Sequence, residues 1–264
     1  MNTVWLLLVF SLCASPMLAS TPAQELAKVK AKVMAADYRA DLPELARLRD
    51  ELAQWPNDRE LAYLARYWSG FASWRIAING ANHAMKSDEL TTNLKNAGAD
   101  FYASLKLKDD FADSYAAASS VNGWLAAFAQ GANDTAGTKE RVYLAVHLLA
   151  RAEALEPKNP RVLWVKGGFF LFRPAALGGS IPRAIEIYKE MLKEADRHPG
   201  DAASPFPDWG KPEALMSLAF AHSMLTPPDL ATARDEAQAA LKLEPEWSYV
   251  RDNLIPRLAP PPTP

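Results

Sequence analysis

The side chains best suited to acid–base or metal chemistry are the four histidines: His83, His147, His198 and His222. No two of them share a helical turn, and the His-Glu-x-x-His pattern that sets two zinc ligands and a base on one helix face is absent. A Gly-x-Ser-x-Gly nucleophile turn is also absent, and Gly178-Gly179 is not followed by the Lys-Ser/Thr pair of a phosphate-binding loop. We therefore predict a protein that is not an enzyme and holds no metal or cofactor.

The carboxylates lead to the same conclusion. Asp109-Asp110 lies at an expected helix boundary, where Asp caps exposed N–H groups and favours the positive end of the helix dipole. The stretch GANDTAGTKE lacks the alternating acidic ligands and closing Glu of a calcium loop. One enzymatic alternative stays open, in which His198, Asp208 and His222 converge from distant parts of the chain into a non-local site.

Composition and charge are those of an ordinary globular protein. The chain has 264 residues, of which 49% are hydrophobic and 23% charged, and its formal net charge is -2. No cluster of Lys or Arg provides the basic surface that nucleic acid or an acidic membrane attracts. We expect neither of these as a partner.

The N-terminus has the order of a secretory signal. An apolar run from Val4 to Leu12 is followed by Pro16 and by small residues at Ala19 and Ser20, although no Lys or Arg precedes the run. The run is shorter than the roughly 20 residues that span a bilayer. We predict a signal peptide over residues 1–20, cleaved near Ala19, and export to the bacterial periplasm. Bulky Leu12 before Cys13 argues against lipidation, and cleavage would leave a mature chain without cysteine.

Beyond residue 22 the apolar positions follow helical spacing. In IPRAIEIYKEMLKEADRHPG, apolar residues recur at steps of three and four with charged residues between them. Pro182 suits a first helical turn, and His198-Pro199-Gly200 is a stop signal. Extended alternation of β-branched residues is missing, so we predict an all-α fold.

A spacing of four, three and five residues repeats along the chain. It joins a small residue, a middle residue that is larger in two of the three cases, a small one and a helix-ending position, and occurs at Ala145-Leu149-Ala152-Pro157, Ala97-Phe101-Ser104-Asp109 and Ala233-Ala237-Ala240-Pro245; Ala184-Tyr188-Met191 repeats its first two steps. Small residues allow a second helix to approach closely, and proline ends the helix where the chain turns. Because an amphipathic helix cannot bury its apolar stripe alone, we predict antiparallel hairpins stacked on one another.

These residues resemble the tetratricopeptide repeat (TPR), a helix-turn-helix unit of about 34 residues. The likeness is closest in LLARAEALEPKNPRVLWVKGG and covers about two thirds of the mature chain. It implies an α-solenoid, a TPR-like superhelix over residues 22–258, ahead of a disordered Pro-rich tail at 259–264. A long insertion at 196–214 departs from the repeat, and we expect its aromatic residues Phe206 and Trp209 to pack back on the array.

Aromatic residues concentrate in the first helices of the hairpins, which line the concave groove in the resembling family. Most of them must serve the core, and one stripe expected to be largely buried comprises Tyr63, Tyr67, Phe71 and Trp74. Trp164 lies beside the core positions Leu163 and Gly167, so its ring is expected on the flank that faces the groove. We predict partner contacts at Trp164, Arg161, Trp124, Tyr63 and Tyr67, because aromatic and Arg anchors carry much binding energy.

The leading hypothesis is an exported scaffold that binds a protein or peptide partner in its concave groove. A first alternative is a solenoid closed around a small ligand, similar to the TPR components that accompany some periplasmic solute transporters. The enzyme with a non-local site is the second alternative, since fold alone does not decide function.

Overall fold

The structure is a computed structural model that describes residues 20–56 and 60–259. The predicted signal peptide, Cys13 and the cleavage site near Ala19 lie outside these ranges, as do residues 260–264 of the predicted tail. The described residues form the following helices, in chain order: α1 (Pro22–Tyr38), α2 (Leu42–Ala53), α3 (Ala62–Asn82), α4 (Ser87–Leu107), α5 (Ala112–Gly131), α6 (Thr135–Leu155), α7 (Pro160–Phe172), the 3₁₀ turn η1 (Ala175–Leu177), α8 (Ile181–Arg197), α9 (Lys211–Ser223), α10 (Leu230–Leu243), the π turn η2 (Tyr249–Leu254) and α11 (Ile255–Arg257). The described part of the chain contains no strand, which confirms the predicted all-α class.

Helix starts follow the capping residues in the sequence. Thr21 and Gln24 form a reciprocal capping box at α1, and the Asn159 side chain accepts the Arg161 N–H at the start of α7. Pro182 lies in the first turn of α8, and α8 ends at Arg197 directly before the predicted stop. These local signals set where each hairpin turns.

Consecutive helices pack as the predicted hairpins, α1 with α2 and so on to α9 with α10. The repeated spacing marks their contact points. Gly167 of α7 lies against the ring of Tyr188 in α8, where an added Cβ would overlap the ring. Gly70 of α3 faces Phe101 of α4 in the same way, with an added Cβ 2.9 Å from the ring. The small-residue positions therefore allow the close helix approach that the pattern predicts.

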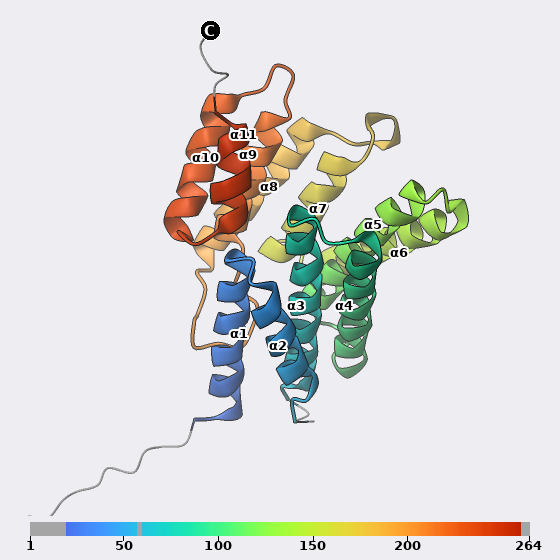
Figure 1. The fold of residues 1–264 in the computed structure, drawn as a ribbon, viewed down its shortest axis with the longest axis vertical. Coiled ribbons are helices and arrows are strands. Elements are labelled where there is room, and N and C mark those ends of the chain that lie inside the picture. The colour runs from blue at the N-terminus through green and yellow to red at the C-terminus, as the bar shows by residue number, and fades with distance from the viewer. Residues whose placement is uncertain (1–19, 57–59, 260–264) are drawn as a thin grey trace, which may run out of the picture.

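The C-terminal elements of the superhelix pack against the end of its first helix, α1. Tyr38, at the end of α1, packs edge-to-face on Trp247 beside η2 with ring centroids 5.1 Å apart, and its hydroxyl donates to Glu213 of α9 at 2.6 Å. Figure 1 shows the C-terminal helices, in red, lying against the end of α1, in blue. The first and last elements of the described chain thus share one apolar cluster around Ala219, Ala237 and Val250.

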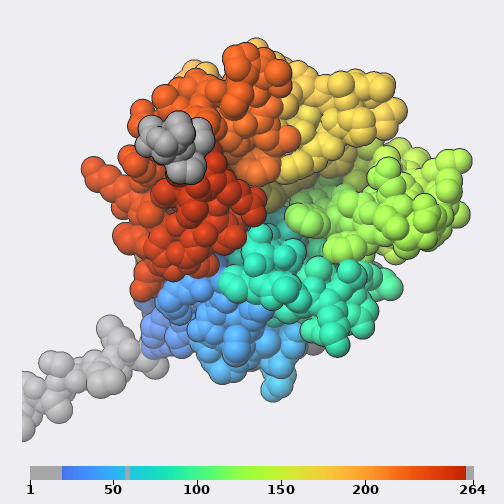
Figure 2. Space-filling model, turned by 45° about the horizontal axis from the view of Figure 1, so that its top comes forward, coloured from blue at the N-terminus to red at the C-terminus, as the bar shows by residue number. Residues whose placement is uncertain are grey.

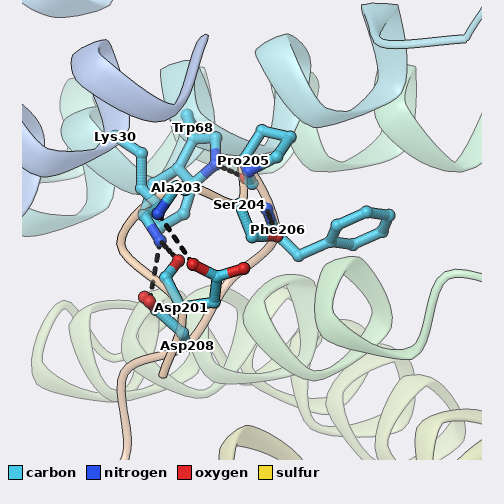
Figure 3. A network of polar contacts seen from close by, with 8 residues as sticks. All are labelled: Lys30, Trp68, Asp201, Ala203, Ser204, Pro205, Phe206 and Asp208. Carbon is cyan, nitrogen blue, oxygen red and sulfur yellow. Dashed lines mark hydrogen bonds and ion pairs between the residues drawn. The ribbon is translucent and has the colours of Figure 1, made fainter. Parts of the chain in front are cut away.

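Residues 198–210 between α8 and α9, which we name the strap, run across to α1 and α3 instead of lying on the surface near their own helices. Trp209 is buried in the main core cluster with Trp68 and Trp74, as its apolar character predicts. Phe206 was expected to pack as well, but 50% of its surface is exposed, because the ring points away from the strap contacts (Figure 3). The strap therefore has one aromatic anchor, not two.

Candidate functional site

The strap occupies the inner side of the first helices. Lys30 of α1, itself buried, donates to the Asp208 carboxylate at 2.7 Å and to the backbone oxygen of Asp201 at 3.0 Å. Trp68 of α3 donates from Nε1 to the backbone oxygen of Pro205 at 2.8 Å (Figure 3). These side chains hold main-chain carbonyls of a non-helical segment, which is how a groove holds an extended peptide.

Trp209 is the point at which helices far apart in sequence meet. Its ring lies 5.7 Å from Trp164 of α7, 5.9 Å from Phe71 and 6.5 Å from Trp74 of α3, in tilted or edge-to-face geometry. Its Nε1 donates to the Tyr67 hydroxyl at 3.2 Å. The indole is therefore surrounded by aromatic rings and hydrogen-bonded.

A small cavity of about 20 Å³ lies beside this indole, with room for about one water molecule. Its walls include four tryptophans, the Asp37–Arg75 ion pair and Glu213, and are formed by Asp37, Phe71, Trp74, Arg75, Trp164, Trp209, Glu213, Met216 and Trp247. Two buried polar atoms of these walls, Trp74 Nε1 and Glu213 Oε2, have no hydrogen-bond partner. Buried polar atoms are rarely left unpaired, so this chamber differs from an ordinary core.

Glu213 is the ionisable group of the chamber whose pKa departs furthest from its ordinary value. Burial away from water raises the pKa of its carboxyl from 4.5 to about 7, against the lowering effect of the hydrogen bond from Tyr38. The same burial, with the neighbouring Glu213, raises the pKa of Tyr38 well above 10. Near neutral pH the chamber wall therefore switches between a neutral and a charged carboxyl.

The sequence-predicted contact residues do not gather on one open surface. Tyr67 is completely buried among Trp68, Phe71 and Phe101, so it can support a binding surface only through its neighbours. Tyr63 is buried against Phe111.

Trp164 and Arg161, both on α7, are held by internal partners. Trp164 is partly buried and donates from Nε1 to Ser217 Oγ of α9 at 3.0 Å. The Arg161 guanidinium donates to the buried Asp113 of α5 at 2.6 Å, and Asn159 donates to the other oxygen of that carboxylate at 3.1 Å. In this state, the polar groups of Trp164 and Arg161 are engaged inside the molecule.

Trp124 of α5 is the member of the predicted set that is exposed, with 38% of its surface open to solvent. The hairpin of α5 and α6 projects from the body of the molecule, as Figure 2 shows in light green. On α6, Val142, Tyr143 and Val146 are exposed large apolar residues. Both helices of this hairpin therefore carry exposed large apolar residues.

A hollow of about 260 Å³, the α6–α7 groove, separates α6 from α7. It is lined by Val146, Leu149, Ala150 and Glu153 of α6 and by Lys166, Phe169, Phe170 and Arg173 of α7 and its end. Lys166 pairs with Glu153 at 3.6 Å, and the Arg173 guanidinium lies 5.2 Å from the Phe169 ring centre. The groove is thus largely apolar, and its charged lining residues are two cations, Lys166 and Arg173, and one carboxylate, Glu153.

Two further large apolar residues are exposed near the end of α7. Phe172 at the end of α7 and Leu177 of η1 are each 68% exposed. Sequence reasoning missed this surface because Tyr143 and Val146 fall within the apolar stretch YLAVHLLA, whose residue types are also those of a core helix. The signal that could have revealed it is the breadth of that stretch, since one helix face buries only part of an apolar circumference.

The residues of the enzymatic alternative each have a different partner. Asp208 binds Lys30, His222 Nδ1 lies 2.7 Å from Glu236, and His198 contacts the backbone oxygen of Glu194. Among the residues that the structure describes, no group of three His, Cys, Asp or Glu side chains is arranged to hold a metal ion. Within the same residues, no helix combines the length and apolar character needed to cross a membrane.

Comparison with known proteins identifies the fold. The chain matches no protein-family model, and no curated protein matches its sequence. It is similar to the solved structure of TTC0263, a thermophilic TPR protein of Thermus thermophilus, with a TM-score of 0.51 and 19% identity over 90% of this chain and 97% of that one. It is also similar to the HusA haemophore of Porphyromonas gingivalis, with a TM-score of 0.55 and 18% identity over 77% of this chain and 94% of that one. The chain therefore has a TPR-like α-solenoid fold.

Proposed function

We propose that this chain is exported and that residues 22–258 act as one TPR-like module, which binds a partner protein through the α6–α7 groove. The observation that carries the proposal is the groove itself, whose lining includes the exposed Val146 together with Phe169 and Phe170. An apolar hollow at the surface favours an interaction site. The expected concave groove is a weaker candidate around α1, α3 and α7, because the strap occupies that wall.

The size and charge of the groove favour a segment of a protein over a small molecule. Pockets for small molecules measure roughly 300–1,000 Å³, whereas this groove measures about 260 Å³. It suits one or two apolar anchor side chains of a partner. Lys166 and Arg173, set against Glu153, favour a carboxylate next to those anchors.

The substitution Val146→Asp tests this proposal. It places a charge on the groove wall at an exposed helix position, so the fold should be kept while apolar anchors are repelled. The mature chain is used as bait in an envelope extract of its source bacterium, and the captured partner is then titrated by calorimetry. We expect Val146→Asp to weaken that partner's binding by about 30-fold or more, equivalent to about 2 kcal/mol.

Leu243→Asp is the matched control, because Leu243 is an equally exposed apolar residue on α10, away from the groove. It should bind the partner as tightly as the wild type does. If Val146→Asp and Leu243→Asp bind the partner equally well, the groove is not the binding site. If Trp164→Ala and Arg161→Lys weaken partner binding while Val146→Asp does not, the partner binds at the concave wall instead.

Small-ligand binding is a second candidate function. It is favoured by the solved HusA structure, which is that of a haemophore, and by the tryptophan-lined chamber next to Trp209. Native mass spectrometry of the protein purified from its source distinguishes this candidate. A retained small molecule of constant mass supports it, and a ligand-free protein that still binds its partner argues against it.

A further inference from the structure

The chamber at the centre of the molecule already binds an aromatic ring, that of Trp209. Trp164, Phe71 and Trp74 surround this indole at centroid distances of 5.7, 5.9 and 6.5 Å. The Tyr67 hydroxyl accepts its N–H at 3.2 Å. Rings arranged at these distances and angles select a planar aromatic group over a bulky aliphatic one.

The Trp209 indole leaves two polar atoms of the chamber walls without a hydrogen bond. The cavity of about 20 Å³ beside it is lined in part by Trp74 and Glu213, whose buried Nε1 and Oε2 atoms have no hydrogen-bond partner. Trp74 Nε1 is a hydrogen-bond donor, and Glu213 Oε2 belongs to a carboxyl group. The two charges nearby, Asp37 and Arg75, are paired with each other at 2.6 Å, so the residues that line the chamber leave no free cation to attract an anion. A neutral polar substituent on the ring would satisfy the two orphan atoms.

The wall that carries Trp209 is the least regular part of the structure around the chamber. Residues 198–210 form no helix, and a few side-chain contacts hold them in place. The polar contacts with α1 and α3 are the Lys30–Asp208 ion pair, whose carboxylate is partly exposed, the bond from Lys30 to the Asp201 backbone oxygen, and the bonds from Trp68 to the Pro205 carbonyl and from Trp209 to Tyr67. Segments held by few contacts open more readily than packed helices do.

We propose that this chamber is a binding site for a planar aromatic molecule with a small neutral polar substituent, and that Trp209 occupies it in the absence of ligand. The ligand displaces the indole, bonds to Tyr67 in its place and extends its substituent toward Trp74 and Glu213. The strap is then the movable wall of the site. This inference is independent of the α6–α7 groove.

The test uses 5-fluoroindole as the probe, with ¹⁹F NMR titration and thermal unfolding of the full protein. Asp208→Asn removes the charge that Lys30 holds but keeps the shape of the strap residue. We expect it to bind the probe at least tenfold more tightly than the wild type does. Trp209→Ala vacates the ring position, so it should bind the probe more tightly still and gain thermal stability from it.

Phe206→Ala is the control, because its ring lies on the same strap but is exposed, and it should bind the probe as weakly as the wild type does. If Trp209→Ala does not fold, as judged by circular dichroism, the comparison of Asp208→Asn with the wild type decides. The proposal is overturned if a folded Trp209→Ala shows no probe binding, or if Asp208→Asn binds no more tightly than Phe206→Ala.

Discussion

Replacing Arg161 with alanine is expected to lower the free energy of unfolding by about 3–5 kcal/mol, although sequence reasoning nominated this residue for partner binding. The substitution would leave the Asp113 carboxylate buried with Asn159 as its remaining side-chain partner. Removing one member of a buried ion pair costs this much because the other charge stays desolvated. Urea denaturation of the protein measures the loss.

Arg183→Ala provides the comparison, since the Arg183–Glu186 pair is exposed on both sides and should contribute less than about 1 kcal/mol. The double variant Arg161→Met with Asp113→Asn removes both charges and should recover most of the lost stability. If the free energy of unfolding of Arg161→Ala lies within about 1 kcal/mol of the wild-type value, the Arg161–Asp113 pair adds little to stability. A role of Arg161 in partner binding would then regain support.

The second large effect concerns pH and Glu213. Its pKa of about 7 lies above the ordinary 4.5, so the folded protein binds a proton more tightly than the unfolded chain does. Stability from this group is therefore fully present below about pH 4.5 and is lost as the pH rises through 7. The pKa difference corresponds to about 3 kcal/mol.

Glu213→Gln should lack this pH dependence, because an amide stays neutral while it still accepts from Tyr38. Between pH 4.5 and 8 the wild type should therefore lose about 3 kcal/mol relative to this variant, as measured by urea denaturation at several pH values. Glu246→Gln, whose side chain is 69% exposed, should follow the wild-type curve. A Glu213→Gln curve parallel to the wild-type one would show that the carboxyl is ionised and solvated at neutral pH.

The helices and their pairing were predictable because they depend on local spacing. Pro182 and the stop at residues 198–200 mark both ends of α8 correctly. Tyr188, the middle residue of one repeated spacing, contacts Gly167 of the preceding helix. Such features involve neighbours within one or two helices, so periodicity and capping determine them.

The path of the strap was only partly predictable. The apolar character of Trp209 indicates burial, but its place among Tyr67 and Trp164 depends on how the superhelix curves. The Lys30–Asp208 pair joins residues 178 positions apart, and no repeat pattern encodes such a contact. The same curvature brings Trp164, predicted to face the groove, against the ring of Trp209.

The α6–α7 groove escaped prediction for the opposite reason. Apolar spacing identifies a helix face but does not show whether a neighbour covers it. Tyr143 and Val146 have the pattern of core residues, yet α6 leaves them exposed. A docking surface and a core contact are built from the same residue types, so only the three-dimensional arrangement separates them.

The most direct test of the burial of Trp209 is ¹⁹F NMR of protein labelled with 5-fluorotryptophan, in the presence of a soluble gadolinium chelate. Each resonance is assigned by a single Trp→Phe variant. The structure predicts that the Trp209 signal is as protected from paramagnetic broadening as the buried Trp68 and Trp74, while Trp124 broadens strongly. A Trp209 signal that broadens as Trp124 does would mean that the strap lies in solvent and the inner wall is open.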